Sequence, residues 1–275
     1  MSEKQINRTQ PERQELPEGY TCTRRDLRET YDQKYGNKPD LGWGPKLRLK
    51  FDYYTPDDYY EATVKNLLKE GFSWADIGCG RNIFPSNPDL AEKLAQKAGY
   101  LLGVDPDENI YDNPYLDEKF KGTVDEYKPE REFDLITLRM VAEHVVDPDV
   151  AIQGLRNMAR SGSLIVVYTP SKWAPMSILA RFTPIGVHHF FKKLLWSTEE
   201  RDTFPVQFKM NTRKRLKELF GSQGFDEVHF SYLDDCRIFS KAYVLKYLEL
   251  SLWRTFKMLG LRYPEACLLG VYRLR

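Results

Sequence analysis

The chain has 275 residues, with 41 basic and 40 acidic side chains and a formal net charge of +1. This length suits one large domain or two small ones, and the even charge balance argues against a protein that mainly binds a nucleic-acid backbone. No uninterrupted apolar stretch reaches the roughly 18 residues of a membrane span, and the polar residues Met1–Leu16 lack the hydrophobic core of a signal peptide. The four cysteines lie far apart and predict neither a zinc site nor a disulfide framework, so we expect a soluble, cytoplasmic protein.

The polar, proline-interrupted residues 1–50 predict a partly ordered lead-in with a short helix around Thr23–Lys34. From there on, helical spacing alternates with short apolar runs. The expected helices are Pro56–Glu70, Pro88–Ala98, Asp149–Ala159, Asn211–Phe220 and Ile238–Leu259. The expected strands are Phe72–Ile77, Tyr100–Val104, Phe120–Val124, Phe133–Leu138, Ser163–Thr169, Glu227–Leu233 and Cys267–Leu274. Strands alternating with helices imply crossover connections and a parallel sheet.

Gly78 and Gly80 directly follow the first expected strand, where they let the main chain turn sharply and approach a ligand closely. Asp76 at the end of that strand can accept a hydrogen bond from a ligand amine. Asp105 ends the next strand, where a carboxylate can bind both hydroxyls of a ribose. The separation from Gly80 to Asp105 is 25 residues, longer than the roughly 20 of the dinucleotide fingerprint, and the third glycine is missing. A ribose and an amine without a diphosphate favour S-adenosylmethionine over NAD.

Four blocks in this order resemble the class I S-adenosylmethionine-dependent methyltransferases. They are Asp76–Gly80, Gly103–Asp105, the fourth-strand block from Phe133 to Pro148, and the fifth strand after the turn Ser161–Ser163. The resemblance implies an α/β fold with a doubly wound, seven-stranded, mostly parallel Rossmann-like sheet whose last strand is antiparallel. It places this domain at residues 51–275, with substrate-cap insertions at about 171–210 and 235–267.

The same resemblance implies S-adenosylmethionine as cofactor and S-adenosylhomocysteine as product. The expected cofactor-binding residues are Asp76, Gly78, Cys79, Gly80, Asp105, Pro106, Asp125 and Arg139. Two positions depart from the family pattern. Asn82 replaces the third glycine, and Thr123 stands where an acid commonly faces the adenine amine, so Asp125 or the backbone must take that role.

The motifs that are missing narrow the reaction. There is no Asp-Pro-Pro-Tyr or Asn-Pro-Pro-Tyr after the fourth strand and no Pro-Cys pair, which argues against methylation of nucleic-acid bases. Arg139 and Met140 stand where metal-dependent relatives hold a carboxylate, so we expect no metal site. The expected reaction is metal-free transfer to an oxygen of a small organic or sugar-like acceptor, with nitrogen as the second choice.

Such a transfer often needs a base, and the candidates are His144, His188 and His189. For each of them a purely structural role stays open. The aromatic and basic segment 235–267 can pack over the pocket, form a homodimer or rest on a membrane surface. The alternative function is a non-catalytic binding or scaffold protein that keeps the methyltransferase fold, and an NAD-linked oxidoreductase is disfavoured by the missing glycine.

Overall fold

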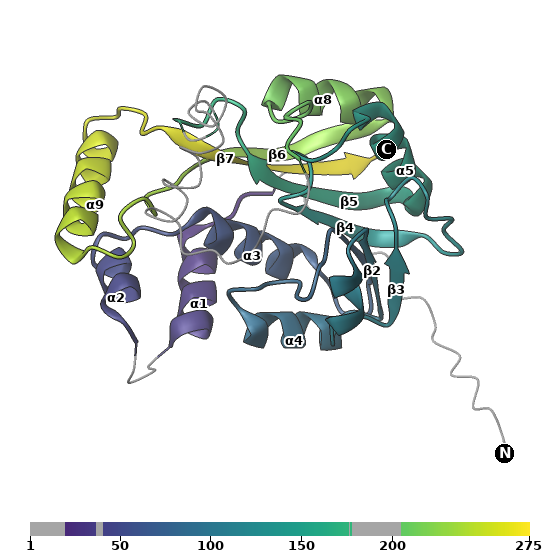
Figure 1. Cartoon of the computed structure of the whole chain (residues 1–275), viewed down its shortest axis with the longest axis horizontal. Helices are drawn as coiled ribbons and strands as arrows, with labels where there is room; N and C mark the ends of the chain where they lie inside the picture. The colour runs from purple at the N-terminus through teal and green to yellow at the C-terminus, as the bar shows by residue number, and fades with distance from the viewer. Residues whose placement is uncertain (1–19, 37–40, 176, 178–204) are drawn as a thin grey trace, which may run out of the picture.

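The computed structural model describes residues 20–36, 41–175, 177 and 205–275, and these residues form a seven-stranded sheet (Figure 1). The strand order is β3-β2-β1-β4-β5-β7-β6, and all neighbours are parallel except that β7 is antiparallel to both β5 and β6. The strands are β1 (Ser73–Ile77), β2 (Tyr100–Asp105), β3 (Glu118–Lys121), β4 (Phe133–Arg139), β5 (Ala159–Pro170), β6 (Phe225–Asp234) and β7 (Glu265–Leu274). This confirms the predicted sheet with its antiparallel last strand.

Helices cover both faces of the sheet, α3 and α4 on one side and α5 and α8 on the other (Figure 1). The helices are α1 (Arg24–Tyr35), α2 (Trp43–Lys50), α3 (Pro56–Leu67), α4 (Pro88–Lys97), α5 (Pro148–Met158), α8 (Arg213–Ser222) and α9 (Tyr243–Met258), with a 3₁₀ helix η1 (Glu108–Asp112). None of the helices in the described ranges is long and apolar enough to cross a bilayer.

Several predicted elements need correction. The third strand lies at Glu118–Lys121 rather than at Phe120–Val124, because the chain turns at Gly122 and Val124 packs into the core instead. Helix α3 ends at Leu67, and Leu68 is already extended, three residues before the predicted stop. Helix α9 starts at Tyr243, later than expected, and neither α2 nor η1 was predicted.

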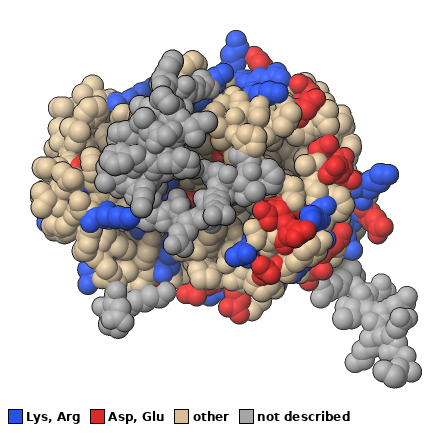
Figure 2. Space-filling model, in the orientation of Figure 1, with Lys and Arg blue, Asp and Glu red and all other residues tan. Residues whose placement is uncertain are grey.

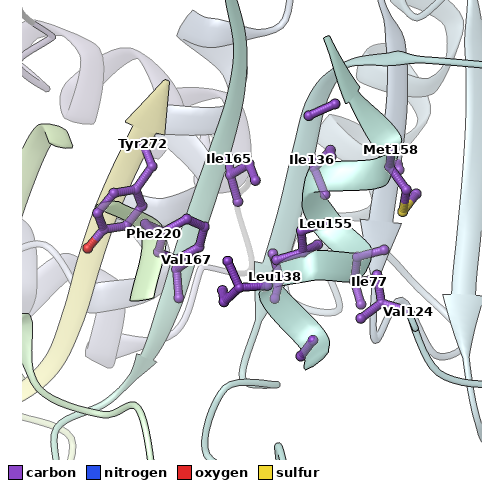
Figure 3. Packing of buried hydrophobic residues seen from close by; sticks show 14 of the residues in the cluster. Ile77, Val124, Ile136, Leu138, Leu155, Met158, Ile165, Val167, Phe220 and Tyr272 are labelled. Atoms are coloured by element: carbon purple, nitrogen blue, oxygen red, sulfur yellow. The ribbon is translucent and has the colours of Figure 1, made fainter. Parts of the chain in front are cut away.

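Side chains alternate between the two faces along the central strands, as the two-residue period of a strand requires. In β5, Ile165 and Val167 belong to the cluster under α5 and α8, whereas Val166 and Tyr168 belong to the cluster under α3 and α4. Figure 3 shows the first cluster, in which the ring of Phe220 stacks on Tyr272 at 4.1 Å between centroids. Each fully buried apolar side chain of this kind stabilises the fold by roughly 1.5–3 kcal/mol.

The same alternation decides where polar side chains of β4 point. Ile136 and Leu138 belong to the cluster on the α5 face, so Thr137 and Arg139 lie on the face that α3 covers. Helix α3 begins with a capping box, in which the Thr55 hydroxyl accepts the N–H of Asp58 and the Asp58 carboxylate accepts the N–H of Thr55. This cap fixes the first turn of α3 beside the end of β4.

Candidate functional site

The ends of β1 and β2 lie side by side, as the sequence predicted. Ile77 is the register partner of Val104, and the N–H of Gly78 donates to the carbonyl oxygen of Val104 at 2.7 Å. The N–H of Gly80 donates to Oδ2 of Asp105 at 2.8 Å. The glycine loop therefore runs directly over the carboxylate at the end of the neighbouring strand.

Both positions of the loop favour glycine, but the space around them differs. Gly78 has φ +71°, and a Cβ there would lie 2.2 Å from Cγ2 of Val141. Gly80 has φ +48°, but a Cβ there would meet nothing within 4 Å. Both backbones adopt a conformation that costs other residues about 1–2 kcal/mol. The space over Gly80 is open to a ligand.

Cys79, between the two glycines, points into the fold. It is 3% exposed, and its Sγ lies toward Gly103, where an added Cβ would come within 2.7 Å of the sulfur. Burial raises the pKa of this thiol well above its usual value. The side chain is therefore a packing group, and only the backbone of Cys79 is available to a ligand.

Asp105 is braced by the loops around it. Its Oδ1 accepts the N–H of Asp107 at 2.8 Å, while Asn113 Nδ2 donates to the carbonyl oxygen of Gly80 at 3.1 Å. Burial raises the pKa of the Asp105 carboxyl, and the two backbone N–H groups act in the opposite direction. Each carboxylate oxygen has further lone-pair capacity, so hydroxyl donors can still bind. Pro106, the next residue, is exposed beside this carboxylate.

Asp76 lies on the other side of the loop, under α3. It is 2% exposed, and Oδ1 accepts the hydroxyl hydrogen of Thr137 at 2.6 Å. Burial raises the pKa of its carboxyl to about 7, although the Thr137 hydrogen bond and the charge of Arg139 lower it. A nearby ammonium group would stabilise the ionised form of such a carboxyl.

Arg139 is held by a partner that the sequence did not indicate. Its Nη2 lies 3.1 Å from Oδ1 of Asp57 in the first turn of α3. Arg237, which follows β6, also forms an ion pair with Asp57 and pairs in addition with Asp235.

An aromatic pair lies on the same side of the site. Tyr60 of α3 stacks on Tyr168 of β5 at 5.3 Å between ring centroids. The ion pairs and the ring pair border the site on the side that α3 covers. No local sequence motif predicts these contacts.

The residues expected to contact the adenine, Asp125 and its surroundings, are more exposed than those around Asp105 and Asp76. Asp125 is exposed, and its backbone lies against α5, where a Cβ at Gly154 would come within 3.1 Å of the Asp125 Cα. It lines a shallow depression with Asp149, Val150 and Gln153. Asn82, which replaces the family's third glycine, accepts the N–H of Phe84 at 2.9 Å and so holds the turn after the loop. The adenine role of Asp125 stays a prediction.

Of the three candidate bases, only His144 falls within the described residues; His188 and His189 lie outside them. His144 is partly buried, with Nδ1 3.3 Å from the carbonyl oxygen of Pro205 and Nε2 4.0 Å from a carboxylate oxygen of Glu143. Glu143 itself is buried, and its Oε2 accepts the hydroxyl hydrogen of Thr169 at 2.8 Å. The carbonyl oxygen of Pro205 is thus within hydrogen-bond distance of the ring, whereas the Glu143 carboxylate is too far away for a hydrogen bond.

Met140 follows Arg139 with φ +55°, a left-handed conformation that is unusual for a residue other than glycine. Its N–H donates to the carbonyl oxygen of Tyr168 at 2.8 Å, which ties this turn to β5. Strained backbone of this kind is found preferentially at functional sites. The sequence indicated Met140 only as a residue in place of a metal-binding carboxylate, and nothing in its residue type could have revealed this backbone conformation.

The residues present fit an adenosyl group that carries an amine. No described protein atom lies within 4 Å of a Cβ placed on Gly80, the carboxylate of Asp105 can accept hydroxyl hydrogens, and the buried acid Asp76 offers a negative group for an amine. Within the described ranges, no group of three or more His, Cys, Asp or Glu side chains could hold a metal ion.

Comparisons with known proteins identify the domain. A model of the methyltransferase domain matches residues 51–229. A ubiquinone biosynthesis O-methyltransferase of Bradyrhizobium diazoefficiens is 29% identical over 150 residues, which cover 48% of this chain and 57% of that protein. A protein of the same description from Methylococcus capsulatus is 23% identical over 176 residues, which cover 58% of this chain and 72% of the relative. The chain thus spans little more than half of the first relative.

Among solved structures, the complex between the Haloferax volcanii Trm112 methyltransferase activator and a methyltransferase contains a similar chain. The likeness covers 84% of this chain and 93% of that one, with a TM-score of 0.53 and 13% identity. At this identity the likeness concerns the fold alone.

Proposed function

The chain belongs to the class I S-adenosylmethionine-dependent methyltransferases, since the domain match covers more than half of it, and we propose from this premise that it methylates an oxygen of a small organic or sugar-like acceptor. S-adenosylmethionine supplies the methyl group on a positively charged sulfur and leaves as S-adenosylhomocysteine. The relatives that the chain resembles are named as O-methyltransferases of ubiquinone biosynthesis, and this supports oxygen as the accepting atom.

The observation that carries the proposal is the hydrogen bond from the N–H of Gly80 to the carboxylate of Asp105. It brings a bend without a side chain and a carboxylate together at one edge of the sheet. In the proposed function, Asp105 accepts the ribose hydroxyls, while Gly78, Cys79 and Gly80 offer backbone close to the ligand. Asp76 provides negative charge at the methionine end.

The remaining predicted residues have supporting roles in this proposal. Pro106 lies where the chain leaves Asp105, and Asp125 is kept as the acceptor for the adenine amine. Arg139 supports the site from the α3 side, because its guanidinium forms an ion pair with Asp57. His144 is proposed as the base that takes the acceptor's proton, because it follows β4 at the edge of the sheet where β1 and β2 also end.

The deciding experiment combines binding with turnover. Calorimetric titration with S-adenosylmethionine should give a saturable signal for the wild type, and Asp105→Asn should weaken it by at least tenfold. Asp107→Asn, two residues away, is the matched control. Incubation with a panel of hydroxylated acceptors should then release S-adenosylhomocysteine. Tight binding without product on any acceptor would instead favour the non-catalytic alternative, and absence of binding at millimolar ligand would reject the proposed methyl transfer.

We also propose that the segment 235–267 contacts a partner outside the chain, either a membrane surface or a second copy. Its central helix α9 carries many exposed apolar side chains. The four cysteines are free thiols, three of them buried, which supports a reducing compartment such as the cytoplasm.

A further inference from the structure

We propose that α2 and α9 together form a surface that binds an anionic lipid bilayer. The proposal deepens the partner contact proposed for residues 235–267 and rests on it. We call the exposed side chains of residues 43–50 and 241–262 the α2–α9 surface.

One side of α9 is anchored in the fold. Leu250 is fully buried, and Lys246 donates to Glu249 at 3.1 Å with both side chains at most 4% exposed. Trp253 Nε1 donates to Oδ2 of Asp234 at 3.1 Å. These contacts fix which face of the helix points outward.

The outward face is apolar. Val244, Leu248 and Leu252 follow one another at steps of four residues and are 68%, 57% and 52% exposed. The neighbouring apolar side chains that are also exposed are Tyr243, Leu245, Tyr247, Met258, Leu259 and Leu261. An apolar stripe of this length on the outside of a helix is a marker of an interaction site rather than of a solvated helix.

Helix α2 extends the same surface. The ring of Trp43 packs against Tyr243 at 5.3 Å between centroids, and Lys50 lies 5.5 Å from the ring centre of Tyr247. Trp43 is 37% exposed. Aromatic rings beside lysines are the side chains that settle at the headgroup level of a bilayer.

The charges on this surface select the partner. Its exposed charged side chains are all basic: Lys46, Lys50, Lys241, Arg254, Lys257 and Arg262. Lys257 and Arg262 also pair with Asp234 and Glu265 at the border of the surface, whereas no such pair is found for Lys46, Lys50, Lys241 and Arg254 among the described residues. Residues 43–50 contain no acid, and the single acid between 241 and 264, Glu249, is 6% exposed and bound to Lys246. Figure 2 shows the same end of the molecule as tan with blue patches. Each basic residue near an anionic membrane strengthens binding by about fivefold.

The place of the surface in the fold suits this partner. Strand β6 is antiparallel to β7, which is antiparallel to β5, so β6 ends at the same edge as β1 and β4. Helix α9 follows β6 from that edge and lies at the far end of the molecule from α5 and α8 (Figure 1). A bilayer bound there would face the side of the sheet that carries Asp105 and Arg139.

The test is sedimentation of the full chain with vesicles of phosphatidylcholine alone and of phosphatidylcholine mixed with phosphatidylglycerol. The wild type should bind the mixed vesicles, and added salt should release it. Leu248→Asp should lower the bound fraction, and Arg254→Glu should weaken binding by at least about fivefold. Tyr232→Asp on β6 and Lys214→Glu on α8 are the matched controls, because both residues are exposed outside the surface.

Equal binding to both kinds of vesicle, or to neither, would overturn the proposal. So would a dimer without vesicles that Leu248→Asp dissociates, since a second copy would then cover the helix. Thermal denaturation of every variant checks folding. Titration of each variant with S-adenosylmethionine separates this proposal from the methyltransferase function, because vesicle binding without cofactor binding would reject only the latter.

Discussion

The guanidinium of Arg139 and the carboxylate of Asp57 lie 3.1 Å apart, and this ion pair joins the end of β4 to the first turn of α3. Arg237 binds the same carboxylate from the segment after β6. One buried acid thus connects three parts of the chain that border the site. Burial acts to raise the pKa of Asp57, but the charges of Arg237 and Arg139 outweigh it and lower the pKa to about 2.

Asp57 should make the fold sensitive to acid. A carboxyl with a lowered pKa stabilises the folded state above the ordinary value near 3.8, and this stabilisation is lost as the pH falls through about 2. It amounts to about 2 kcal/mol, of which about 1 kcal/mol should be lost between pH 5 and pH 3. Urea denaturation at the two pH values should show this loss for the wild type. Asp57→Asn should lack that part of the pH dependence, and an equal slope in both proteins would contradict the assignment.

Gly80→Ala should separate cofactor binding from stability. Alanine at this positive φ should lower the free energy of unfolding by about 1–2 kcal/mol, but its Cβ would meet no described protein atom within 4 Å. We expect a folded protein whose affinity for S-adenosylmethionine falls at least tenfold, measured by calorimetry. Gly162→Ala is the matched control, because Gly162 also has a positive φ, +88°, and open space around it. If both variants bind the cofactor equally, the loop does not approach the ligand.

Asp76 should make cofactor affinity depend on pH. Its carboxyl has a pKa raised to about 7, and a positively charged amine favours the ionised form. The affinity for S-adenosylmethionine should therefore rise roughly tenfold from pH 6 to pH 8 as the free protein loses this proton. The same titration of Asp76→Asn accounts for the ligand's own ionisation. A pH dependence that survives in this variant would assign the effect to another group.

Lys34 should be essential for the packing of α1 on α3. Its ammonium lies 3.2 Å from Asp58 and 2.9 Å from Glu61, and all three side chains are at most 4% exposed. Lys34→Met leaves two buried carboxylates without this cation and should cost about 3–5 kcal/mol of unfolding free energy. Lys65→Met, which removes a longer ion pair to Glu29, should cost less than about 1 kcal/mol. Urea denaturation compares the two, and equal costs would show that the buried network is not stabilising.

His144→Gln tests the proposed base. A general base contributes about 10²–10⁴-fold, so kcat should fall by that factor while the dissociation constant of S-adenosylmethionine stays unchanged. A threefold or smaller change in kcat would leave His144 as a packing residue and transfer the role to His188 or His189.

The local sequence pattern predicted the sheet and the part of the site that contains the glycine loop and Asp105. Alternating helical and strand periods predicted the strand–helix order, because the periods of 3.6 and 2 residues reflect which side chains are buried. The glycine loop and Asp105 could be placed together because parallel strands end at one edge of a sheet. The third strand was misplaced because Glu118–Lys121 contains a single apolar residue, Phe120, and none of the four residues is fully buried.

Only the tertiary structure decided what surrounds these groups. Arg139 and Asp57 are 82 residues apart, and Arg237 and Asp57 are 180 apart, so no local pattern could pair them. Asp76 is buried among groups from other segments, such as Thr137 of β4, and the exposure of α9 depends on which of its faces packs against the fold. Sequence periodicity records that a side chain is apolar or charged, whereas its partner is set by how distant segments pack.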